Sequence, residues 1–99
     1  MNVKEEFGAM LEEAGTRLGD LGEEKREEMA AYAAERAERA AIIIDGAEPG
    51  LDEFLIAARD NLALKGSLVI GEGADAVGIE WRGLLLGGLR FAALALAGA

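Results

Sequence analysis

The C-terminal stretch, residues 75–99, decides the fold class and reads DAVGIEWRGLLLGGLRFAALALAGA. Asp75 suits the N-cap position of a helix, and the only later charges are Glu80, Arg82 and Arg90. Helical spacing gathers a broad apolar face opposite Asp75, Arg82 and Arg90. The members of that face are Val77, Trp81, Leu84, Leu85, Gly88, Phe91, Ala92 and Ala95. Such a helix is buried among partners or lies against a membrane.

The composition extends this expectation to the whole chain. Its 99 residues fit one domain, and 52% are hydrophobic while only 5% are aromatic. Most of the apolar residues are therefore alanine, leucine and isoleucine, which suit contacts between helices. We expect an all-α fold, a single helical domain over 1–99 with a charged half at 1–46 and an apolar, glycine-rich half at 47–99.

Local signals divide the chain into a small bundle of about four helices, near 3–19, 22–45, 49–65 and 75–97. Asn2 with Glu5 forms a capping-box pattern, and Asp20 with Glu23 repeats it before the second helix. Pro49 sits where the third helix could begin. The stop signals of the second and third helices are Asp45-Gly46 and Gly66.

Apolar residues at helical spacing mark the buried faces of the first and third helices. Those of the first helix are Val3, Phe7, Met10, Leu11, Ala14, Leu18 and Leu21. Those of the third helix are Leu51, Phe54, Leu55, Ala58 and Leu62. A short extended segment near 68–70 could pair with residues 42–44, although a buried connector is the simpler reading.

Four glycines, Gly8, Gly15, Gly19 and Gly22, line up beside the apolar stripe of the first helix. Each interior glycine costs about 1 kcal/mol relative to alanine, so the alignment indicates that another backbone approaches closely there. The alternative is that these glycines only mark fraying and a turn near residues 19–22.

The sequence excludes most catalytic chemistry. It contains no cysteine and no histidine, which removes thiolate and imidazole nucleophiles, bases and metal ligands. Residues 45–52 lack the alternating acidic ligands of an EF-hand. We expect no enzyme, no catalytic residue, no metal and no cofactor.

The net charge of −9 has the wrong sign for direct nucleic-acid binding. We expect a structural or assembly protein that self-associates or is built into a larger complex, such as a virion or an injection machine. The expected interface residues are Gly8, Gly15, Gly19, Trp81, Leu84, Leu85, Gly88, Phe91, Ala92 and Ala95.

Two alternatives remain open. An acidic inhibitor or adaptor would present its glutamate-rich face to a basic partner, and this binding would weaken with salt. A membrane-associated protein would use the C-terminal helix, but Arg90 would lie near the middle of a span, which disfavours insertion. The N-terminus lacks the pattern of a secretory signal, so we expect a cytoplasmic location or one within an assembled particle.

Overall fold

The computed structural model describes residues 2–68 and 76–98 and contains four helices. They are α1 (Val3–Leu18), α2 (Glu23–Asp45), α3 (Leu51–Gly66) and α4 (Ala76–Ala97). No strand occurs in these two ranges, and the all-α prediction is confirmed. Of the predicted extended segment only Leu68 belongs to them, and the expected cap Asp75 lies outside the described residues.

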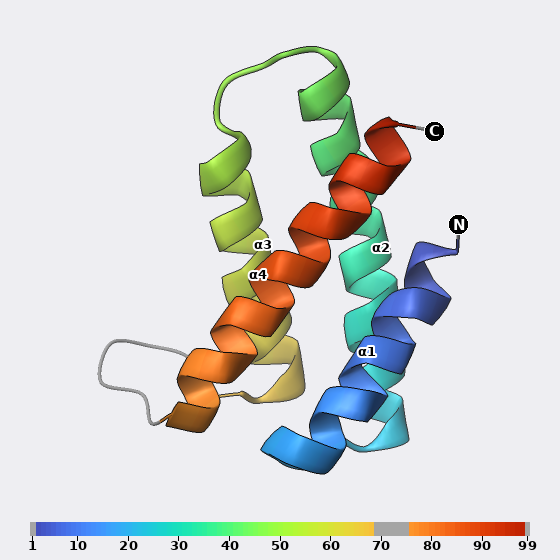
Figure 1. The fold of residues 1–99 in the computed structure, drawn as a ribbon, viewed down its shortest axis with the longest axis vertical. Coiled ribbons are helices and arrows are strands. Elements are labelled where there is room, and N and C mark those ends of the chain that lie inside the picture. Colours follow the sequence, from blue (N-terminus) through green and yellow to red (C-terminus); the bar gives the residue numbers. More distant parts are fainter. Residues whose placement is uncertain (1, 69–75, 99) are drawn as a thin grey trace.

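The helices form a bundle in which α2 takes the central place (Figure 1). The three most extensive helix contacts are those of α2 with α1, α3 and α4. In the view of Figure 1, α4 crosses in front of α2 and α3, with α1 beside it. The contact between α1 and α4 is the least extensive, and among the described residues no Cα atom of α1 lies within 8 Å of one in α3.

The cap predicted for α1 is present in the structure, whereas the capping box predicted for α2 is absent. The Asn2 side chain caps α1, because its Oδ1 accepts a hydrogen bond from the Glu5 backbone N–H at 3.1 Å. The N-cap of α2 is Gly22, without a side-chain hydrogen bond, so the predicted Asp20 capping box does not form. Asp20 lies two residues before this N-cap, too early to reach the first-turn N–H groups.

The ends of α2 and α3 share one geometry. Ala47 and Ser67 adopt left-handed φ values of 50° and 57°. The next residue in each case donates its N–H back into the helix, from Glu48 to the Ile43 carbonyl at 3.0 Å and from Leu68 to the Ala63 carbonyl at 2.9 Å. Both ends are therefore Schellman motifs in which a residue other than glycine takes the left-handed position.

Gly66 is the last residue of α3 and is needed for packing. A Cβ at this position would lie 2.6 Å from Sδ of the fully buried Met29. The start of α3 also differs slightly from the expectation, because Gly50 takes a left-handed φ of 92° and the helix begins at Leu51, two residues after Pro49.

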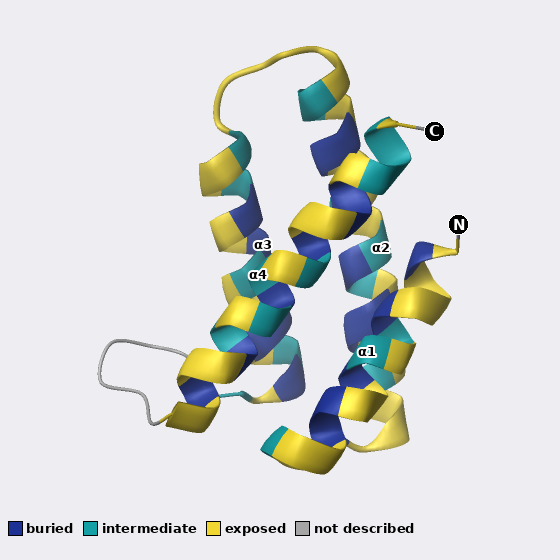
Figure 2. Ribbon diagram, in the orientation of Figure 1, coloured by how far each residue is buried: buried dark blue, intermediate teal, exposed yellow. Residues whose placement is uncertain are grey.

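A main apolar core lies between the helices, beside a smaller cluster formed by Val3, Ala37 and Ala92 (Figure 2). The predicted stripes of α1 and α3 face the main core, with Leu11, Leu55 and Leu62 fully buried. The residues that α2 buries are Met29, Ala30, Ala33, Ala37, Ala40 and Ala41. All but one of these are alanines, and the partly buried Tyr32 and Ile44 of α2 also pack against the core.

The buried face of α4 is rotated from the predicted one. Trp81, Leu85 and Ala92 are buried as expected, but Leu89 joins the core and Phe91 is exposed. The helix is apolar around most of its circumference, so hydrophobic spacing could not select the face that packs inward.

Candidate functional site

The clearest candidate site is a row of apolar residues on the outer side of α4. Leu84, Gly87, Phe91 and Leu94 recur at intervals of three and four, and together they form what we call the outer stripe. Phe91 is 64% exposed and Leu94 55%, while Leu84 is half-buried. The exposed segments along α4 are visible in Figure 2. This row follows the spacing of a helix-pairing surface.

Packing within the chain does not require the two glycines on this side of α4. Gly83 and Gly87 are exposed, and a Cβ built at either position would meet nothing within 4 Å. Each costs about 1 kcal/mol of helix stability relative to alanine. Gly88, the next residue, contrasts with them, because its Cβ would lie 2.9 Å from Met10 Sδ and 3.0 Å from Phe7 Cε2.

An apolar groove adjoins the outer stripe where α1 and α4 meet. Its volume is about 250 Å³, and Phe91 stands on its wall. The other lining residues are Val3, Glu6, Phe7, Met10, Gly88 and Ala92. The groove exists because α1 and α4 make the least extensive of the helix contacts and leave Met10 half-buried.

The outer stripe is also the part of the chain without acidic residues. No aspartate or glutamate follows Glu80, although the net charge of the chain is −9. Arg90 contacts Asp52 of α3, with 3.5 Å between Nη2 and Oδ1. Arg82 is half-buried, and its Nε has no hydrogen-bond partner among the described residues. The carboxylates that lie near this segment therefore come from other helices, among them Asp52 of α3 and Glu6 of α1.

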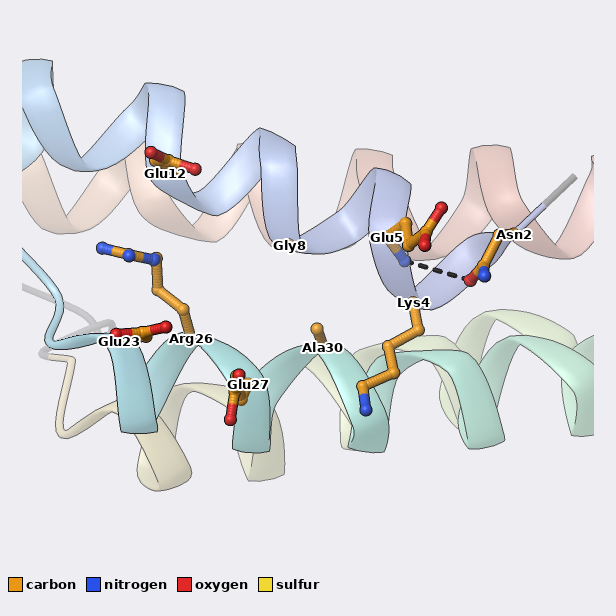
Figure 3. Close-up of a pocket in the computed structure, with 9 residues that line it drawn as sticks. All are labelled: Asn2, Lys4, Glu5, Gly8, Glu12, Glu23, Arg26, Glu27 and Ala30. Atoms are coloured by element: carbon orange, nitrogen blue, oxygen red, sulfur yellow. Dashed lines mark hydrogen bonds between the residues drawn. The ribbon is translucent and has the colours of Figure 1, made fainter.

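A second, polar groove of about 470 Å³ lies between α1 and α2 (Figure 3). Lys4 extends from α1 toward α2, and Arg26 extends from α2 toward α1. The Arg26 Nη1 donates to the Leu21 carbonyl at 2.9 Å. Four carboxylates line this groove, those of Glu5, Glu12, Glu23 and Glu27. No group of three acidic side chains in the described residues is placed to hold a metal ion.

The structure divides the predicted interface residues into two groups. Trp81, Leu85 and Ala92 are buried in the chain's own core. The first glycines of α1 are also occupied within the chain, because a Cβ on Gly8 would lie 3.8 Å from the Ala30 Cβ and one on Gly15 would lie 3.8 Å from the Leu21 N.

Gly19 is exposed and ends α1 with φ 130°, as the turn alternative expected. Leu84, Gly88, Phe91 and Ala95 remain half-buried or exposed. These four are the predicted interface residues of α4 that a partner could still reach.

Sequence reasoning missed Gly83, Gly87 and Leu94. The signal was present, because Leu84, Gly87, Phe91 and Leu94 follow a three-four spacing of their own. This second apolar stripe overlaps the broad apolar face that was predicted first, so it was not recognised as a separate surface.

No known family model matches the sequence, no curated protein matches it, and no solved structure matches the fold. Among the helices of the described residues, none is long and apolar enough to cross a bilayer.

Proposed function

We propose that this protein is a non-enzymatic assembly subunit that associates with copies of itself through the outer stripe of α4. The observation that carries the proposal is an exposed apolar row, centred on Phe91 and Leu94, on a helix that carries no negative charge after Glu80. A subunit of a larger particle, such as a virion or an injection machine, would use the same kind of surface.

Charge supports a second copy as the partner. Two molecules that each carry a charge of −9 repel one another wherever their acidic faces approach. The segment after Glu80 carries only Arg82 and Arg90, so contact through α4 brings no carboxylates of that segment together. The exposed glycines Gly83 and Gly87 would let two α4 backbones approach closely, as small residues do at helix crossings.

The free energy that this contact contributes to association is moderate. Burying one phenylalanine or leucine side chain contributes about 1.5–3 kcal/mol. A two-fold interface would bury Phe91 and Leu94 from each copy, and these four side chains give at most about 6–12 kcal/mol. Association itself costs roughly 4–15 kcal/mol. The complex should therefore depend on concentration and dissociate on dilution.

Light scattering across a dilution series tests the proposal, with Leu94→Glu as the disrupting variant and Leu64→Glu as the matched control. Leu64 is 74% exposed and belongs to α3, whereas the outer stripe belongs to α4. We expect the wild type and Leu64→Glu to associate alike, and Leu94→Glu to be monomeric at concentrations where they do. A wild type that stays monomeric at every concentration would refute self-association.

A second candidate function, an acidic adaptor, is favoured by the four carboxylates of the groove between α1 and α2. It predicts binding to a basic protein that weakens steeply as salt rises, because exposed charges are screened. Association through the outer stripe is apolar and should persist in the same salt series. Ionic strength therefore separates the two functions.

A further inference from the structure

We propose that, in the self-associated form, Phe91 of one copy inserts its ring into the α1–α4 groove of a second copy, and the second copy returns the same contact. This inference rests on the proposed function and adds to it a specific knob and a specific pocket.

The aromatic residues of the chain identify the occupant. Trp81 and Phe7 are buried, Tyr32 and Phe54 are half-buried, and Phe91 is 64% exposed. A second copy of this chain therefore offers one freely exposed aromatic ring, that of Phe91. An exposed ring next to an unfilled apolar groove leaves both surfaces in water until they meet a partner.

The groove has the size and chemistry for such a ring. An apolar cavity of roughly 150 Å³ is enough to hold a benzene molecule. The α1–α4 groove has a volume of about 250 Å³ and is lined mainly by apolar side chains, among them Val3, Phe7 and Met10. One phenyl group with its methylene fits that volume, whereas a whole helix does not.

The position of the ring makes the contact self-complementary. Phe91 stands on the wall of the groove of its own chain, so knob and pocket lie next to each other on one face. In a two-fold dimer each copy presents the same patch, and a residue that contacts its partner receives the same contact in return. With the axis close to Phe91, both rings can enter the partner's grooves together.

The charges at the rim are complementary as well. Within residues 2–68 and 76–98, Glu6 is the only charged residue that lines the groove, and it forms no ion pair with another of these residues. Arg90 precedes Phe91 and is half exposed, with Asp52 at 3.5 Å. The segment of α4 after Glu80 carries only basic charges, so the partner's groove, with Glu6 at its rim, approaches a segment of opposite charge, which favours the encounter of two otherwise acidic chains.

Mixing two variants tests the inference. Phe91→Ala removes the knob but keeps most of the pocket, and Met10→Glu places a charge in the pocket but keeps the knob. We expect each variant alone to associate roughly tenfold or more weakly than the wild type, since each homodimer loses both insertions. The mixture should form a heterodimer that retains one insertion and is tighter than either homodimer. Sedimentation with one chain fluorescently labelled measures it.

The outcomes separate this inference from the proposed function. Recovery in the mixture also shows that both chains are folded; if Met10→Glu melts below the assay temperature, Met10→Gln repeats the test. If Leu94→Glu and Phe91→Ala both weaken association while Met10→Glu leaves it unchanged, the outer stripe stands and the insertion of the ring into the groove is wrong. If the wild type is monomeric and floats with phosphatidylcholine vesicles, and the Met10→Glu variant floats less, then lipid occupies the α1–α4 groove and both proposals fail.

Discussion

Adjacent glycines in α4 provide a matched pair for testing the packing between α1 and α4. Gly87 and Gly88 lie in the same helix and gain the same amount from substitution by alanine, about 1 kcal/mol. Their surroundings differ. The added methyl group of Gly87→Ala meets nothing within 4 Å, whereas that of Gly88→Ala would lie 2.9 Å from Met10 Sδ and 3.0 Å from Phe7 Cε2.

The expected effects therefore have different signs. Gly87→Ala should stabilise the fold by about 1 kcal/mol, which raises the melting temperature by about 4–8 °C in a domain of this size. At position 88 the same gain is opposed by an overpacking cost of about 1–3 kcal/mol. Met10 is half-buried and can swing aside, but the Phe7 ring is buried. Gly88→Ala should range from no change to a loss of about 2 kcal/mol.

Thermal melts followed by circular dichroism measure both variants, in a Leu94→Glu background so that association does not contribute. The informative quantity is the difference between the two melting temperatures, because the helix propensity gain cancels. Equal stabilisation by both substitutions would refute the reasoning, since it would mean that neither Phe7 nor Met10 lies against Gly88.

Two further pairs of substitutions test the left-handed residues between α2 and α3 and the buried face of α4. Ala47→Gly should stabilise the fold by up to about 1 kcal/mol, because Ala47 holds a left-handed φ of 50°, which glycine adopts more easily. Gly50→Ala should destabilise the fold, because Gly50 has a left-handed φ of 92°. Urea unfolding measures both free energies. Leu85→Ala should destabilise the fold by about 2–5 kcal/mol, because Leu85 is fully buried. Leu94→Ala should cost less than about 1 kcal/mol in the monomer, because Leu94 is exposed. Similar losses of stability for the two variants would contradict the orientation of α4.

The sequence predicted the helices well because their limits depend on nearby residues. Asn2 caps the helix that it precedes, and the glycines at 19 and 22 flank the turn between the first two helices. Such signals act over one turn of backbone and need no knowledge of the rest of the fold. The structure differs from the prediction only in details: the residue that takes the left-handed conformation at the end of α2 is Ala47, one residue after the predicted stop at Gly46.

The candidate site was harder to predict because it depends on which face of α4 the other helices cover. Leu85 and Phe91 both belonged to the predicted apolar face, yet Leu85 is fully buried and Phe91 is exposed. The sequence of α4 is apolar on nearly every side, so local spacing cannot tell a core residue from an exposed one. The choice is made by contacts with α2 and α3, which are distant in sequence.

The central place of α2 has a consequence for the order in which the chain folds. Its contacts with α1 and α3 join helices that are neighbours in the sequence and are linked by short turns, so they close small loops at little entropic cost. Contacts of this kind form early and make folding fast. Because docking of α4 onto α2 closes a longer loop, we expect it to come later. The groove and the outer stripe would then be completed last, so the proposed contact between copies of the chain would form only after each copy has folded.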